Sequence, residues 1–180
     1  FRHDGNCSTE GGTMAYRGGA GGSIWVFASS LTGNGRFSAK GGDGGILRVG
    51  GGGRLAFILT DPDSDFSDFT GTMTAYSGVG HAFAGTVYRE TVEDGAGHGE
   101  LIVDNKNGYA DGAYPYPDVF VYSRMATELN YYEPVSYAFS RIVLTNKAVL
   151  YVGADDTLDL RNTELVGGGP GTGIRVGGGT

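Results

Sequence analysis

The sequence predicts an all-β fold, a right-handed parallel β-helix or solenoid with glycine-rich loops. Three observations point to it. Glycine occupies 35 of the 180 positions, more than twice its usual share of about 7%. Hydrophobic residues still make up 39% of the chain and aromatic residues 12%, which is too apolar for a disordered protein. Apolar residues also recur in short alternating runs, the pattern of strands joined by tight turns.

Eleven segments carry this strand pattern, each bounded by Gly, Asn or Asp. The best helical candidate, residues 123–130, has only one turn of helix formers before it meets Pro134. Strands without intervening helices exclude an α/β layout. The predicted strands are residues 23–28, 36–39, 54–59, 72–76, 85–89, 100–103, 119–122, 137–144, 148–152, 157–160 and 173–176.

The spacing of apolar positions favours a solenoid over a β-sandwich. Near the end of the chain, inward positions are expected every seven to nine residues, and three such steps make about 24 residues, the length of one coil of a three-faced β-helix. In the first hundred residues the spacing stretches to 13–18, which long glycine-rich loops such as 41–53 explain. A sandwich has turn signals every 8–12 residues and remains the alternative. The inward positions are Ile142, Leu150, Leu158, Leu165 and Ile174, and corner candidates include Asn146 and Asn162.

Three regions are expected along the chain. Residues 1–104 form a glycine-rich solenoid half with long loops. Residues 105–134, rich in Tyr, Pro, Gly and Asn, form an irregular surface insertion. Residues 135–180 form regular coils, continuous with the first half and sharing one core with it.

Charge and cysteine content narrow the classes of function. The net charge is −7 and the basic residues are scattered, which argues against nucleic-acid binding. No apolar run of about 18 residues is present, so no membrane-spanning helix is expected. Cys7 is the only cysteine. The preferred interpretation is an unpaired thiol, and the alternative is a disulfide with another chain or with residues outside this segment. The low lysine content and frequent Asn, Thr, Ser and Tyr predict an extracellular or cell-surface location.

Three glycine-rich blocks in a fixed order, residues 21–27, 31–45 and 50–57, carry a resemblance. The chain resembles a glycine-rich repeat module of very large secreted and cell-surface proteins of bacteria. The likeness continues through residues 73–78, 84–88, 100–105 and 148–158, and departs from the pattern at 111–133. It implies a β-helical, surface-displayed segment of a longer protein, and no catalytic motif comes with it.

Alternating carboxylates in residues 61–68 are the sharpest local signal. The preferred interpretation is an acidic turn stabilised by Asx and Ser side chains. The alternative is a Ca²⁺ site, since this cation accepts six to eight oxygens in flexible geometry. No other cofactor is expected. The candidate ligands are Asp61, Asp63, Asp65 and Asp68.

Tyrosines crowd the middle of the chain and could either cover an edge of the solenoid or contact a glycan or protein partner. The candidate contact residues are Tyr109, Tyr114, Tyr116, Tyr131 and Tyr132. An acidic strip, formed by Glu90, Glu93, Asp94, His98 and Glu100, has the residue types of a glycosidase. The glycines within it suit a turn better than a preorganised active site.

The leading functional hypothesis is a structural or adhesive segment of an extracellular filament, sheath or giant surface protein. Uncapped solenoid ends favour self-association or continuation along a longer chain. The first alternative is a carbohydrate-binding module that uses the exposed tyrosines. The second is a β-helix polysaccharide lyase or hydrolase, by fold analogy alone. The protein is not predicted to be an enzyme.

Overall fold

The computed structural model describes residues 1–44, 49–79, 82–106, 126–128, 135–153, 155–168 and 172–176. These ranges contain strands, turns and loops without helices, so the predicted all-β class is confirmed. Within them there is no helix with the length and hydrophobicity that crossing a membrane requires.

Fourteen short strands are described, and most lie where alternating apolar residues predict them. Residues 119–122 lie outside the described ranges. The strand at 126–128 falls in the segment named as the best helical candidate, and the predicted segment 137–144 is divided into two strands. The strands are β1 (Asn6–Ser8), β2 (Ser23–Ala28), β3 (Arg36–Ser38), β4 (Arg54–Leu59), β5 (Thr72–Thr74), β6 (Thr86–Glu90), β7 (Glu100–Asp104), β8 (Ala126–Glu128), β9 (Ser136–Ala138), β10 (Arg141–Thr145), β11 (Val149–Val152), β12 (Thr157–Asp159), β13 (Glu164–Gly167) and β14 (Gly173–Val176).

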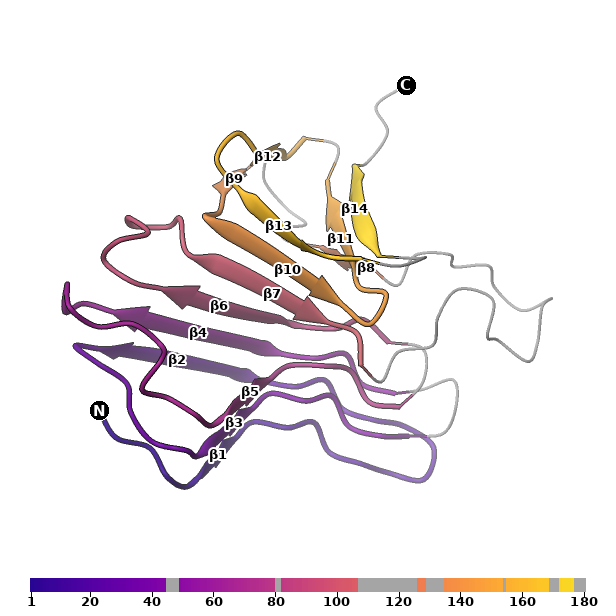
Figure 1. The fold of residues 1–180 in the computed structure, drawn as a ribbon. Helices are drawn as coiled ribbons and strands as arrows, with labels where there is room; N and C mark the ends of the chain where they lie inside the picture. The colour runs from indigo at the N-terminus through magenta and orange to yellow at the C-terminus, as the bar shows by residue number, and fades with distance from the viewer. Residues whose placement is uncertain are drawn as a thin grey trace.

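The strands form four sheets that are mostly parallel. The largest has the order β13-β10-β7-β6-β4-β2, and the others are β1-β3-β5, β14-β11-β8 and β12-β9. Of the ten strand pairings among these elements, only β6 with β7 is antiparallel. In Figure 1 the arrows of β2, β4 and β6 point one way, and those of β7, β10 and β13 the other. This pairing is not that of an antiparallel sandwich.

The first ninety residues make three passes through the same two sheets. Each pass crosses the small sheet, runs through a glycine-rich arm, and returns through the large sheet (Figure 1). Successive passes pair in register: Cys7 with Phe37 and Phe37 with Met73 in one sheet, Ile24 with Leu55 in the other. The register repeats after 30–36 residues, longer than the 24-residue coil expected from the C-terminal spacing, because the arms lengthen each pass.

The three arms lie against one another as two layers of backbone, called here the glycine double layer (residues 9–22, 39–44, 49–53, 75–79 and 82–85). Within one layer, Gly11 donates to the Lys40 carbonyl at 2.8 Å. Between the layers, Gly42 donates to the Gly19 carbonyl at 2.8 Å and Gly50 to the Gly42 carbonyl at 2.9 Å. Backbone therefore bonds to backbone in two directions, and this satisfies buried polar groups without side chains.

The close approach of the two layers explains the glycine content. A Cβ placed on Gly50 would lie 1.7 Å from the Gly19 carbonyl oxygen, and one on Gly18 would lie 1.9 Å from that of Gly42. No side chain fits at such a distance, so these positions require glycine.

The first apolar cluster lies between the small sheet and one face of the large sheet. Phe37 of β3 meets Phe57 of β4 edge to face, with ring centroids 4.9 Å apart. Both side chains are almost completely buried. The remaining buried members come from the second and third passes, and residues of the first pass pack against them partly buried. The buried members are Leu31, Ala39, Leu55, Leu59, Ala75 and Val87, and the first-pass residues are Cys7, Ile24 and Val26.

A second apolar cluster lies on the opposite face of the large sheet. Directly paired residues share a sheet face. Val87 of β6 pairs with Ile102 of β7, and both belong to the first cluster. Tyr88 pairs with Leu101, which belongs to the second cluster with Ile142 and others. The described residues thus form two apolar clusters, one on each face of the large sheet.

The reversal between β6 and β7 depends on a turn that the chain makes with two glycines. Gly95 and Gly97 have φ angles of 80° and 78°, in the region that glycine occupies at no steric cost. After this turn the chain covers the opposite face of the large sheet, where the second cluster lies. Beyond it, β7 and β10 again pair in parallel. The sheet itself thus runs unbroken from residues of the first predicted region into those of the third.

The C-terminal spacing is confirmed in part. Ile142 pairs with Leu165, 23 positions later, and Leu150 pairs with Ile174, 24 positions later. Ile142 and Leu150 are fully buried. Leu165 shares the sheet face of Ile142 but is 56% exposed, so it lies on the predicted side without being buried. Leu165 lies on β13, an edge strand that no described strand covers on its outer side. The expected corner residue Asn146 has a φ of 54°, a conformation in which asparagine is enriched.

Candidate functional site

The acidic residues 61–68 lie in the loop between β4 and β5, where their carboxylates stabilise local turns. Asp61 accepts a hydrogen bond from the backbone of Asp63 at 3.1 Å, and Asp65 accepts one from that of Ser67 at 2.8 Å. The Ser67 hydroxyl and then its backbone N–H lower the pKa of Asp65. Among the described residues, no three His, Cys, Asp or Glu side chains come together as metal ligands would. The acidic-turn interpretation fits this geometry, and the Ca²⁺ interpretation gains no support from it.

Cys7 lies in the middle of β1, in register with Phe37. Its side chain is partly buried and packs against the first apolar cluster. The thiol therefore has a packing role in this fold, and the alternative of a disulfide with another chain or with residues outside this segment stays a prediction.

The candidate contact tyrosines Tyr109, Tyr114, Tyr116, Tyr131 and Tyr132 lie outside the described residues. Their neighbour Tyr137 is described, and its ring stacks on that of Phe139 at a centroid distance of 6.3 Å. That contact belongs to the edge of the second cluster.

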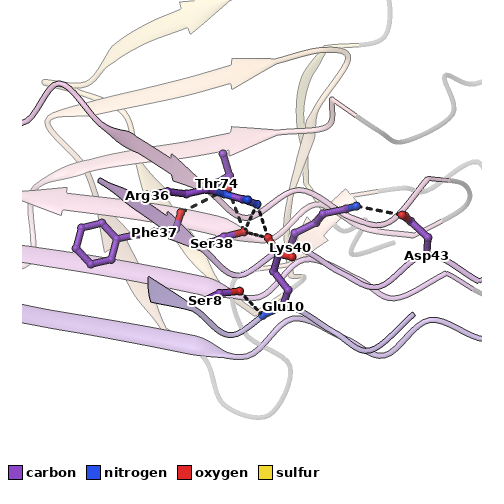
Figure 2. A network of polar contacts seen from close by, with 8 residues as sticks. All are labelled: Ser8, Glu10, Arg36, Phe37, Ser38, Lys40, Asp43 and Thr74. Atoms are coloured by element: carbon purple, nitrogen blue, oxygen red, sulfur yellow. Dashed lines mark hydrogen bonds and ion pairs between the residues drawn. The ribbon is translucent and has the colours of Figure 1, made fainter. Parts of the chain in front are cut away.

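A polar network covers the outer side of the small sheet (Figure 2). Ser8, Ser38 and Thr74 stand in register on β1, β3 and β5, and Thr74 donates to the Ser38 hydroxyl at 3.3 Å. The Glu10 carboxylate accepts hydrogen bonds from the Ser38 hydroxyl and the Arg36 guanidinium. Because Ser38 is fully buried beneath this ion pair, a substrate cannot reach its hydroxyl. The network ties strands together.

Asp43 connects all three passes at one point. Its carboxylate accepts a hydrogen bond from the backbone of Val79 at 2.8 Å, and its own N–H donates to the Thr13 hydroxyl at 3.1 Å. Lys40 also pairs with it at 3.1 Å (Figure 2). The Val79 hydrogen bond, followed by that from Lys40, lowers the pKa of Asp43. This aspartate fixes the arms relative to one another.

The acidic strip near the β6–β7 turn is divided between the two faces of the sheet. Glu90 bonds to the Tyr88 hydroxyl and to the backbone of Gly97. Burial, and then the hydrogen bond to Glu90, raise the pKa of Tyr88 above its usual value. Glu100 instead pairs with Arg89 and Arg141, on the face opposite Tyr88.

This division decides against a glycosidase-like pair at the strip. Two catalytic carboxyl groups must flank the same glycosidic bond, and Glu90 and Glu100 project from opposite faces of the sheet. Asp94 accepts hydrogen bonds from Thr91 and from Ser140 at 2.7–2.9 Å. The side chains of the strip therefore stabilise the turn at which the chain reverses direction between β6 and β7.

One surface that sequence reasoning missed is the face of β2, β4 and β6 turned away from the first cluster. Trp25 and Phe27 project from β2 on this side and are 75% and 70% exposed. The signal was present in the sequence: residues 23–28 are apolar on both faces of the strand, whereas an exposed face usually carries polar residues.

Comparison with protein-family models, with curated proteins and with solved structures found no match to this chain. The resemblance to a glycine-rich module of large surface proteins therefore stays a prediction, carried by the residues quoted for it.

Proposed function

We propose that this chain is a structural or adhesive segment of an extracellular assembly, built as a right-handed parallel β-solenoid. The supporting observation is the in-register parallel pairing of successive passes in two sheets at once. Repetition of this kind makes each pass a platform for the next. Right-handedness follows from the strong preference of parallel crossover connections for that hand.

The glycine double layer supports a mechanical role. Its hydrogen bonds run along the stack, as from Gly21 to Gly51 at 2.9 Å, and also across it, as from Gly53 to Ala39 at 2.8 Å. Pulling passes apart must break many backbone bonds together. A segment that only displayed a catalytic loop would gain nothing from such an arm.

The edge at β1 and β2 supports stacking on a further unit. These strands lie at the same end of the stack (Figure 1), each at an edge of its own sheet, and no described strand pairs with their outer sides. The carbonyls of Gly22 and Ala28 accept bonds from the backbone N–H groups of Arg54, the first residue of β4, and of Thr60, the residue after its end. By the alternation of a parallel ladder, Ser23, Trp25 and Phe27 direct their N–H and C=O groups outward. An open edge of this kind recruits another strand, from the same polypeptide or from a second copy.

The extracellular setting rests on composition and on the resemblance, as given above. The candidate contact tyrosines supply no geometry for the carbohydrate-binding alternative, because they lie outside the described residues. The opposed placement of Glu90 and Glu100 gives the lyase or hydrolase alternative no support.

Light scattering at increasing protein concentration tests the stacking proposal. We expect the mean mass to rise above that of one chain, and Ser23→Pro to shift this rise to at least about tenfold higher concentration, equivalent to about 1.4 kcal/mol. Proline removes the outward N–H of Ser23 and is tolerated on an edge strand.

The matched control for the edge is Ser23→Ala, which removes the hydroxyl and keeps the N–H. It should assemble like the unmodified chain, and both variants should unfold at similar temperatures. An unmodified chain that stays monomeric throughout the concentration series would remove the proposal.

A further inference from the structure

The face of β2, β4 and β6 that carries Trp25 is called here the outer face. Parallel pairing arranges nine side chains on it in three rows of three, because in-register neighbours project side by side. One row is polar, one is aromatic at both ends with alanine between, and one is apolar with a glutamate at its end. The rows are Ser23–Arg54–Thr86, Trp25–Ala56–Tyr88 and Phe27–Ile58–Glu90.

The outer face combines exposed aromatic surface with an unpaired cation. Trp25 and Phe27 are 75% and 70% exposed. They lie two residues apart on β2, so their Cα atoms are about 7 Å apart. Arg54 is exposed, and its guanidinium forms no ion pair with the part of the chain that the structure describes. At the far end of the rows, Glu90 is buried and already bonded to Tyr88.

The size of the outer face argues against a folded protein as its occupant. With strands about 4.8 Å apart and a rise of about 3.3 Å per residue, three strands and three rows cover roughly 10 by 13 Å. A stable protein interface buries about 800 Å² on each partner, several times this area. A linear ligand that contacts two or three side chains in succession fits the dimensions.

We propose that the outer face binds a polysaccharide chain that carries carboxylate groups. Pyranose rings present flat C–H faces, which pack well on aromatic side chains whose polar tips remain hydrated. Consecutive sugar rings would contact Trp25 and Phe27, and a uronate carboxylate would pair with Arg54. An arginine offers a carboxylate two parallel N–H donors, which a neutral sugar cannot use in the same way.

The net charge of −7 does not oppose this contact at physiological salt. The Debye length there is about 8 Å, so carboxylates elsewhere on the molecule are largely screened. The pairing of Arg54 with a uronate acts at contact distance and is screened less. Binding should accordingly weaken as salt is raised.

Isothermal titration calorimetry with polygalacturonate and with the neutral glucan amylose tests the proposal. We expect binding of polygalacturonate, at least about tenfold weaker binding of amylose, and a loss of about tenfold or more for Trp25→Ala. Arg54→Gln should reduce the affinity for polygalacturonate and flatten its salt dependence, while leaving the weak binding of amylose unchanged.

The control is Tyr16→Ala, which removes an aromatic side chain that is 81% exposed but lies in an arm. It should bind like the unmodified chain. Absence of polygalacturonate binding, equal affinity for both glycans, or unchanged affinity after Trp25→Ala would each overturn the proposal. If Trp25→Ala instead abolished the concentration-dependent mass increase, a second copy would be the occupant.

This inference does not depend on stacking. Asn6→Pro on β1 removes an outward N–H at the same open end but lies away from the outer face, so it should retain polygalacturonate binding while losing assembly. Loss of either property alone therefore identifies which of the two proposals has failed.

Discussion

Replacing Gly50 with alanine is expected to lower the free energy of unfolding by about 3 kcal/mol or more, enough to unfold a marginally stable chain. The added Cβ would meet the Gly19 carbonyl oxygen at 1.7 Å. Relief requires the two backbone layers to move apart, which would break the hydrogen bonds from Gly42 and Gly50 that join them. Urea unfolding followed by circular dichroism measures the change.

The adjacent glycine provides the control for Gly50. A Cβ on Gly51 would touch only the Phe83 carbonyl oxygen, at an ordinary contact distance of 3.5 Å. Gly51→Ala should therefore cost little, and it can even stabilise by restricting the unfolded chain. Gly11 and Gly12 form a second such pair, with a 1.8 Å contact and open space respectively. Equal effects of Gly50→Ala and Gly51→Ala would contradict the double layer.

Phe57→Ala is expected to cost about 3–5 kcal/mol, the usual loss for a fully buried aromatic side chain. Phe57 is 0% exposed and packs edge to face on Phe37, so truncation leaves a cavity that rigid neighbouring strands cannot close. The same urea unfolding measurement applies.

Phe27→Ala is the matched control for the core, since Phe27 lies on the neighbouring strand but is 70% exposed. Its truncation should change the free energy of unfolding by about 0.5 kcal/mol or less. A loss for Phe27→Ala as large as that for Phe57→Ala would mean that the outer face is covered by another part of the molecule.

Strand positions could be predicted from the sequence because alternation of apolar residues is a local property. The predicted bounds of residues 54–59 agree with β4, where Leu55, Phe57 and Leu59 point into the cluster. Strand β13 was not predicted, since it begins with the exposed Glu164 and carries only two large apolar residues. Its pairing with β10 maintains it as a strand despite weak local preference.

The antiparallel step between β6 and β7, and the change in the sheet face that later strands cover, could not be predicted. Apolar and polar residues alternate in the same way in parallel and antiparallel strands. The sequence of residues 86–104 therefore does not indicate that β6 and β7 pair antiparallel. The consequence is the division of the apolar residues into two clusters. The turn between the two strands contains Gly95 and Gly97, both with positive φ angles. Glycines occur in many other loops of the sequence, so these two do not by themselves indicate an antiparallel turn.

Some features of the candidate sites could be predicted from the sequence and others could not. The local hydrogen bonds of Asp61 and Asp65 follow from turn chemistry that short-range sequence can indicate. The outer face depends instead on register, which brings Trp25 beside Ala56 and Tyr88 from three separate passes. Glycine-rich arms of unequal length separate these residues in the sequence, so their spacing there carries no simple period.

The central claim is that successive passes pair parallel and in register, and engineered disulfides in a Cys7→Ala background test it directly. Parallel pairing places Ser23 beside Arg54 and Phe27 beside Ile58, at Cα separations of about 4.8 Å that a disulfide can bridge. Cysteines at either pair should therefore cross-link on mild oxidation, as measured by mass spectrometry under non-reducing conditions. The exchanged pairs, Ser23→Cys with Ile58→Cys and Phe27→Cys with Arg54→Cys, should stay reduced, and cross-linking of the exchanged pairs instead would contradict the parallel stack.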